Sequence, residues 1–109
     1  MQHKTLFFLA LFFTITVQAE DMLERSTMTS CAYQAGTARE IQTIRQSEGD
    51  DWSQFEQKIT KIYKEGQGRQ DLLVIAKVVY QQPTTTLTSV VYDNTFAACV
   101  KRTQDAATS

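Results

Sequence analysis

The stretch Cys31-Ala-Tyr-Gln-Ala-Gly-Thr-Ala-Arg-Glu-Ile-Gln-Thr-Ile-Arg45 decides the fold class of this 109-residue chain. Small or apolar residues recur here every three or four positions, and Met28 extends the series toward the N-terminus. The repeated positions are Met28, Cys31, Ala35, Ala38, Ile41 and Ile44. This spacing places them on one face of an α-helix. The sequence therefore predicts a helix from about residue 22 to residue 47.

Glycine and aspartate mark the end of this helix and the start of the next. Gly36 lies inside the first helix, where a small residue would let another helix approach closely, and Gly49 stands at the expected C-terminal cap. Asp50 and Asp51 follow as N-terminal caps for a second helix, residues 52–64. Its apolar positions again have helical spacing: Trp52, Phe55, Ile59, Ile62 and Tyr63.

The second half of the chain is more ambiguous. Residues 69–82 and 84–102 are expected to form two further helices, with Asp71 and the threonines at 84–86 as possible N-terminal caps. Residues 72–80 and 87–92 are rich in β-branched side chains, which also favour strands. These two segments could instead pair as a hairpin across Pro83. Helices are preferred because residues 72–80 lack the polar–apolar alternation of a half-buried strand.

Together these segments predict an all-α fold, a small four-helix bundle forming a single domain over residues 20–102. Residues 103–109 have no apolar anchor and are expected to fray. Cys31 and Cys99, 68 positions apart, are expected to form one disulfide between the first and last helix. In the chain-entropy view, such a cross-link stabilises the fold by roughly 4 kcal/mol.

Residues 1–19 have the pattern of a cleaved signal peptide. A short basic start at His3 and Lys4 precedes an uncharged apolar run over residues 5–17, and Ala19 precedes the charged Glu20. The apolar run is too short to span a bilayer as a helix. We therefore expect cleavage after Ala19 and a periplasmic or secreted protein with no membrane attachment.

The charge balance bears on the choice of partner. Residues 1–19 contain one lysine and no acidic residue, so ten basic and twelve acidic residues remain after cleavage and the net charge is −2. Nucleic-acid binding requires a basic surplus or stripe. No nucleic-acid partner is expected.

Residue types also bear on catalysis. Residues 20–109 contain no histidine, which is the commonest general base and transition-metal ligand. Bonded cysteines supply neither a thiol nucleophile nor a thiolate ligand. Glu48, Asp50 and Asp51 surround Gly49, but they lack the spacing of an EF-hand, and helix capping accounts for them. The sequence therefore predicts a protein that is not an enzyme, with no metal and no cofactor.

Aromatic and basic residues supply the candidate binding site. Trp52 and Tyr63 lie in the second predicted helix near Lys61 and Lys64, and aromatic anchors dominate many protein interfaces. These four residues are the predicted binding residues, and the expected function is non-catalytic binding of another protein, as an inhibitor, immunity-type or accessory factor. The alternative is a periplasmic small-ligand-binding or stress-holdase module.

Three segments carry a family resemblance: residues 31–45, residues 75–83 and the late Cys99. Together they resemble small, largely uncharacterised, exported helical proteins of Gram-negative bacteria that have a single disulfide. The resemblance covers most of the chain after residue 19. It implies a periplasmic address and no particular activity.

Overall fold

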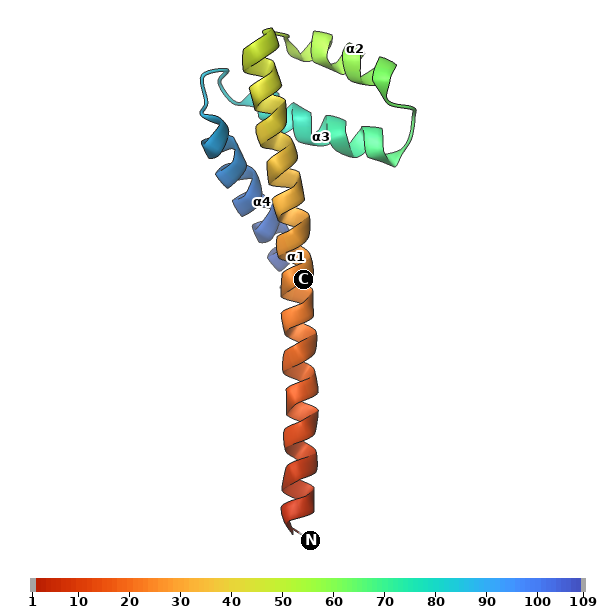
Figure 1. The fold of residues 1–109 in the computed structure, drawn as a ribbon, viewed down its shortest axis with the longest axis vertical. Helices are drawn as coiled ribbons and strands as arrows, with labels where there is room; N and C mark the ends of the chain where they lie inside the picture. Colours follow the sequence, from red (N-terminus) through yellow and green to blue (C-terminus); the bar gives the residue numbers. More distant parts are fainter. Residues whose placement is uncertain (1, 109) are drawn as a thin grey trace. The chain divides into compact units, whose positions relative to one another are not determined.

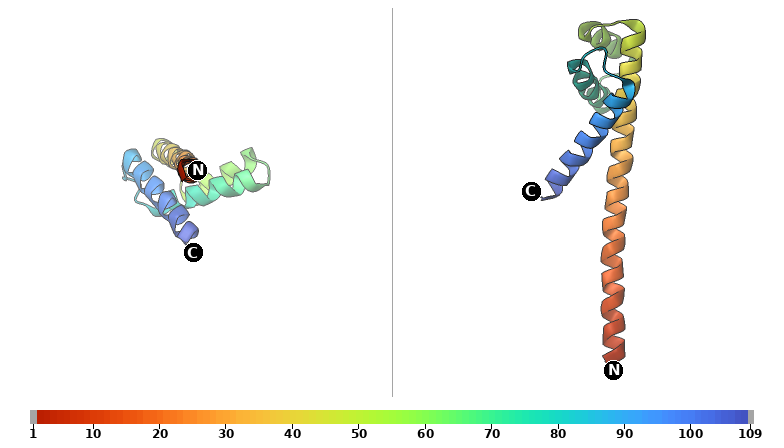
Figure 2. Two further views of the ribbon diagram at one scale, coloured as in Figure 1. Left: turned by 90° about the horizontal axis from the view of Figure 1, so that it is seen from below. Right: turned by 90° about the vertical axis from the view of Figure 1, so that its left-hand side faces the viewer.

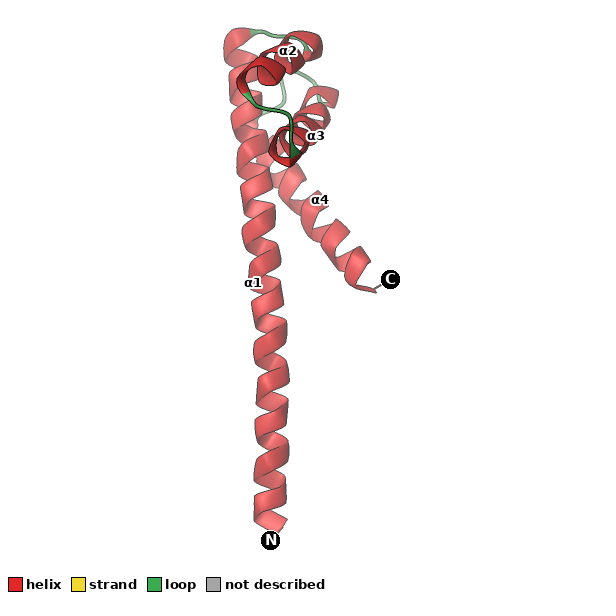
Figure 3. Cartoon of the chain, turned by 90° about the vertical axis from the view of Figure 1, so that its right-hand side faces the viewer, coloured by secondary structure: helices red, strands yellow, loops and turns green. Residues whose placement is uncertain are grey.

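The structure is a computed structural model that describes the backbone of residues 2–108 and the side chains of residues 24–107. It contains four helices, α1 (Gln2–Glu48), α2 (Trp52–Ile62), α3 (Gln67–Gln81) and α4 (Thr88–Thr108) (Figure 1). Only loops connect them, and no strand occurs between residues 2 and 108 (Figure 3). The predicted all-α, four-helix fold is confirmed, and the alternative hairpin over residues 72–92 is wrong.

The chain divides into two compact units, residues 1–30 and residues 31–109, and each is described by itself. The backbone of residues 2–30 is helical, as part of α1. The predicted signal peptide, residues 1–19, lies outside the residues whose side chains are described, so its cleavage stays a prediction. Among the described residues, we find no helix with the length and apolar character needed to cross a membrane.

The boundary between α1 and α2 follows the predicted signals. Gly49 has a φ of 73°, a left-handed conformation that favours glycine, and its N–H donates to the carbonyl of Arg45 (2.9 Å). Asp51 caps α2 by accepting a hydrogen bond from the backbone N–H of Gln54 (2.8 Å), and the Gln54 side chain accepts from the Asp51 N–H (3.0 Å). This is a reciprocal capping box, with glutamine as its second member.

The predicted caps of α3 and α4 are wrong. The N-terminal cap of α3 is Gly66, and Asp71 lies within the helix, where it accepts a hydrogen bond from Gln67 (2.7 Å). Residues 84–86 precede the start of α4 at Thr88.

At its other end α4 continues to Thr108, so residues 103–108 extend the helix. Fraying of this end in solution stays a prediction.

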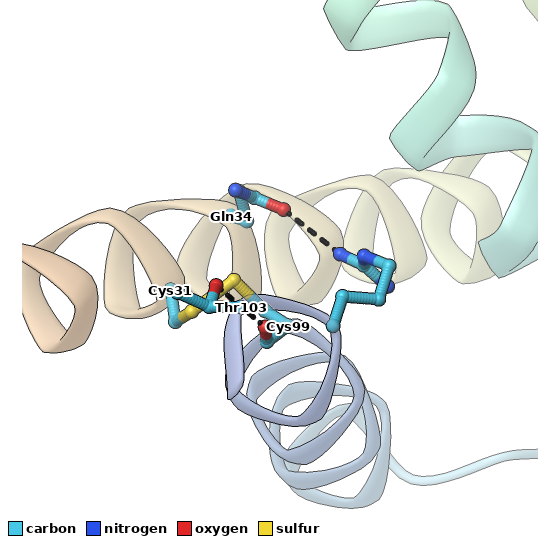
Figure 4. Close-up of a disulfide and its surroundings, with 5 residues drawn as sticks. Cys31, Gln34, Cys99 and Thr103 are labelled. Carbon is cyan, nitrogen blue, oxygen red and sulfur yellow. Dashed lines mark hydrogen bonds between the residues drawn. A yellow bond between two sulfur atoms is a disulfide. The ribbon is translucent and has the colours of Figure 1, made fainter. Parts of the chain in front are cut away.

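Within residues 31–109, α2 and α3 form an antiparallel helical hairpin that runs across α1 rather than along it (Figures 1 and 2). After α3, the chain turns at Pro83 and α4 returns toward α1. There the Cys31–Cys99 disulfide joins the two helices, with Cα atoms 5.4 Å apart (Figure 4). The predicted disulfide between the first and last helix is thus confirmed, and the bundle is orthogonal.

The core lies where α2, α3 and α4 meet α1. Its buried residues are Ala38, Ile41, Phe55, Ile59, Ala76, Val79 and Val91. Ile44, which was expected on the buried face of α1, is instead 37% exposed. The close-packing interpretation of Gly36 is also wrong, because a Cβ atom built there would meet nothing within 4 Å.

Two polar residues of α1, Gln42 and Arg45, occupy positions next to this apolar core. Both are buried, with exposed fractions of 0% and 8%. Arg45 donates to the carbonyls of Val79 (3.2 Å) and Gln82 (2.9 Å) at the C-terminal end of α3. This end of a helix presents unpaired carbonyls and partial negative charge, which a guanidinium group satisfies.

Gln42 performs the equivalent task for the loop between α3 and α4. Its amide nitrogen donates to the carbonyls of Thr84 (3.1 Å) and Thr86 (2.9 Å). The exposed Gln46, one turn further along α1, donates to the same two carbonyls (3.0 and 3.1 Å). Three side chains of α1 therefore fix the turn that directs α4 back to the disulfide.

Candidate functional site

The four predicted binding residues lie on α2 or directly after it, but they do not form one site. Trp52, the first residue of α2, is half-buried against the rings of Phe55 and Tyr80, with centroids 6.4 and 5.6 Å away. Tyr63 is the C-terminal cap of α2 and is 47% exposed. Lys61 and Lys64 are exposed. Trp52, Lys61 and Tyr63 each line a different hollow of the surface.

The lysines of α2 also have different surroundings. Lys58 forms ion pairs with Glu48 (2.9 Å) and Asp50 (2.6 Å). These hydrogen bonds raise the pKa of Lys58 above its usual value. The acidic residues around Gly49 therefore serve two structural purposes, because Asp51 caps α2 and the other two bind Lys58. Lys61 instead lines a separate shallow hollow with Arg69 and Leu73.

The hollow that contains Tyr63 lies between α1 and the α2–α3 hairpin and has a volume of about 290 Å³. We call it the α1–α2 hollow. Its lining residues are mostly aromatic or aliphatic, and its single ionisable carboxylate belongs to Glu40. They are Tyr33, Thr37, Glu40, Ile41, Ile44, Phe55, Ile59, Tyr63 and Leu72.

A stripe of α1 forms one wall of this hollow. Tyr33, Thr37, Glu40 and Ile44 are spaced four, three and four residues apart, so they follow one another along a single helix face. Tyr33 is 75% exposed, and Ile62 beside Tyr63 in sequence is exposed as well. The floor is the core itself, because Ile41, Phe55 and Ile59 are buried. The result is an open surface of mixed polar and apolar character above the apolar core, with two tyrosines in its lining.

A second, more polar hollow of about 330 Å³ lies at the start of α2, between Arg45, Asp50, Trp52 and Tyr80. The Arg45 guanidinium stacks over the Tyr80 ring, with its Cζ 4.6 Å from the ring centroid. The Tyr80 hydroxyl is inaccessible and has no hydrogen-bond partner among the described residues. Burial therefore raises the pKa of Tyr80. No group of three potential metal ligands was found among the described residues of the chain.

The remaining hollow lies between α3 and α4 and has a volume of about 510 Å³. We call it the α3–α4 groove. Aliphatic residues of α3 form one wall, and residues of α4 form the other. The groove is lined by Gln34, Val74, Ile75, Val78, Asn94, Thr95, Ala98 and Arg102. At one end, Arg102 donates to the Gln34 side-chain oxygen (3.4 Å), and Gln34 lies next to the disulfide (Figure 4).

Sequence reasoning found Tyr63 but missed the α1 stripe and the α3–α4 groove. Tyr33 stood inside a predicted helix without being assigned to a face. Its spacing to Ile44, through Thr37 and Glu40, is the signal that would have placed both residues on the same exposed side. The groove depends on the crossing of α3 and α4, which no local pattern specifies.

The disulfide indicates an oxidising, exported location, because such bonds persist in oxidising compartments. No family model, curated protein or solved structure matches the chain. The comparisons therefore assign no family, and the resemblance to small exported single-disulfide proteins stays an expectation.

Proposed function

We propose that this chain is a periplasmic, non-catalytic protein that binds another protein through the α1–α2 hollow. The observation that carries the proposal is the exposure of Tyr33 and Tyr63 in the lining of a hollow whose floor is the apolar core. Tyrosines are enriched in protein interfaces, where their rings give contact area and their hydroxyls stay hydrated. Buried charges are depleted at interface centres, and Glu40 is the single carboxylate in this lining.

The geometry also favours a protein over a small molecule at this surface. The lining includes a stripe of α1 about three turns long and the end of α2. Together they offer an extended contact area. The hollow's volume of about 290 Å³ lies just below the range of small-molecule sites, which favours a protein partner. The proposed role remains that of an inhibitor, immunity-type or accessory factor.

The test is co-purification with tagged protein, using periplasmic extract, followed by the same experiment with Tyr33→Ala and Tyr63→Ala. A partner that uses the α1–α2 hollow should be lost from both variants, because hot-spot truncations cost about 2 kcal/mol or more of binding free energy. Lys61→Ala is the matched control, because Lys61 is also on α2 but lines a different hollow. Capture of the partner by both tyrosine variants at the wild-type level would place the interface elsewhere.

The variants are expected to fold. Both tyrosines are exposed, so their truncation should change the melting temperature little. The proposed address has its own test, the intact mass of the exported protein. We expect a chain that begins at Glu20 with two hydrogens missing for the disulfide, and retention of residues 1–19 would contradict this.

A further inference from the structure

The α3–α4 groove is larger than the α1–α2 hollow, and its lining is more apolar. Val74 and Val78 lie one turn apart on α3 and are 65% and 51% exposed, so two aliphatic side chains stand open to solvent on the same helix face. Ala98 of α4 forms the opposite wall. The volume of about 510 Å³ falls within the range of small-molecule sites. The groove therefore offers space for an apolar chain.

One end of the groove carries the positive charge of Arg102. Arg102 forms no ion pair with any side chain of residues 24–107, and its guanidinium donates to the neutral amide of Gln34 over 3.4 Å. That distance is long for an N–H···O bond. A carboxylate would bind the same guanidinium with shorter, charge-assisted and bidentate hydrogen bonds. No acidic side chain lines the groove to oppose an anion.

The disulfide fixes this charged end in place. Gln34 lies three residues after Cys31, and Arg102 lies three residues after Cys99, so both project from helices that are covalently joined one turn away. The Thr103 hydroxyl donates to the Cys99 carbonyl (3.0 Å) at the same crossing (Figure 4). The disulfide thus fixes the backbone positions from which Gln34 and Arg102 project.

We propose that the α3–α4 groove binds a free single-chain carboxylate amphiphile. Its carboxylate contacts Arg102, and its alkyl chain lies along Val74, Val78 and Ala98. A polypeptide would bring backbone N–H and C=O groups that the valine wall cannot satisfy, whereas an alkyl chain needs no polar partner. This site is separate from the proposed protein-binding hollow and does not depend on it.

Calorimetric titration of the disulfide-bonded protein with octanoate, decanoate and dodecanoate, each below its micelle concentration, tests the proposal. We expect saturable one-to-one binding that tightens with chain length, by up to about 4-fold for each buried methylene. Dodecyltrimethylammonium, with the same chain and the opposite charge, should bind at least about 10-fold more weakly than dodecanoate.

Two pairs of variants locate the site. Arg102→Gln should weaken dodecanoate binding about 10-fold, and Val78→Ser should weaken it several-fold. Arg69→Gln and Val90→Ser are the controls, because they make the same changes outside the groove lining, and both should bind within about 2-fold of wild type. All four melting temperatures are measured, so that a loss of binding is read only on folded protein.

Three results would overturn the proposal. The first is no saturable binding of dodecanoate. The second is equal binding by Arg102→Gln, Val78→Ser and their controls, which would mean adsorption elsewhere. The third is binding to phosphatidylglycerol vesicles without binding of the free carboxylate, which would assign the groove to a membrane surface instead.

Discussion

Arg45 is a buried cation, and no described side chain forms an ion pair with it. Its hydrogen bonds go to backbone carbonyls at the end of α3 and to the side-chain oxygen of Gln42 (3.3 Å), and the Tyr80 ring covers one face of the guanidinium. The C-terminal carbonyls of a helix carry partial negative charge, which offsets part of the cost of burying the guanidinium. Arg45 thereby joins α1, α3 and the following loop at a single point.

Replacement of Arg45 by methionine keeps the bulk of the side chain but removes all these donors. We expect the free energy of unfolding to fall by about 2–4 kcal/mol, because buried carbonyls lose charge-assisted hydrogen bonds. Arg45→Lys should recover only part of this loss, since one ammonium group cannot reach several carbonyls as a planar guanidinium does. Urea denaturation measures both values. An unchanged midpoint for Arg45→Met would contradict the role assigned to this side chain.

The Tyr80 hydroxyl, by contrast, is buried and has no hydrogen-bond partner among the residues that the structure describes. Tyr80→Phe removes that hydroxyl while keeping the ring contacts with Trp52 and Phe55. We expect the variant to be about 1 kcal/mol more stable at neutral pH, because an unsatisfied buried polar group is costly. Thermal and urea denaturation measure the difference. A variant less stable than wild type would show that the hydroxyl has a partner.

The stability difference between wild type and Tyr80→Phe should also depend on pH. Burial raises the pKa of Tyr80 above its usual value of 10.0, so the folded state favours the neutral phenol. Above about pH 10 the unfolded chain loses this proton more readily than the folded chain, and wild-type stability falls. Lys58, whose pKa is also raised, is present in both proteins, so its contribution to the pH dependence is the same in each. The advantage of Tyr80→Phe should therefore widen between pH 9 and pH 11.

At the scale of the helices, the sequence pattern identified all four elements because apolar spacing and glycine signals agree with the fold. The pattern failed where polar side chains are buried. Apolar periodicity found the buried Cys31, Ala35, Ala38 and Ile41, but it selected the exposed Ile44 and missed the buried Gln42 and Arg45. The predicted N-terminal caps were wrong because α3 begins after Gly66 without a side-chain cap, and α4 begins at Thr88, beyond the three threonines.

Two glycines of the α1 region give opposite predictions for the same substitution. Gly36→Ala should stabilise the protein by about 1 kcal/mol, because alanine is the better helix former and its Cβ meets open space. Gly49→Ala should destabilise it by about 1–2 kcal/mol, because φ is 73° there. Chemical denaturation of both variants tests this pair. Destabilisation by Gly36→Ala would mean that a neighbour does approach that face.

At the scale of the whole molecule, the disulfide compensates for a small core. It joins positions 68 residues apart, and the double variant Cys31→Ser/Cys99→Ser should lower the free energy of unfolding by roughly 4 kcal/mol. Far-UV circular dichroism should still show helix at low temperature, with a lower melting temperature than the oxidised protein. Equal melting curves for the oxidised protein and the double variant would contradict a stabilising role of the bond.

The candidate sites were less predictable than the fold. Tyr63 was chosen from sequence because it lies near lysines, yet its neighbours in space are Tyr33 and Ile44 of α1. Lys61 and Trp52 point to other hollows, because successive residues of a helix face different directions. A helix-based pattern gives the face of each residue, but which faces meet depends on the way the α2–α3 hairpin crosses α1.

The most direct test of the proposed binding function is site-specific photocrosslinking in cells. A photoreactive phenylalanine analogue is placed at Tyr33, at Tyr63, or at the exposed Asp93 of α4, which lines none of the four hollows described. If the α1–α2 hollow binds a protein, positions 33 and 63 should give the same adduct by mass, and position 93 should not. Equal adducts from position 93, or no adduct from positions 33 and 63, would contradict the proposed function.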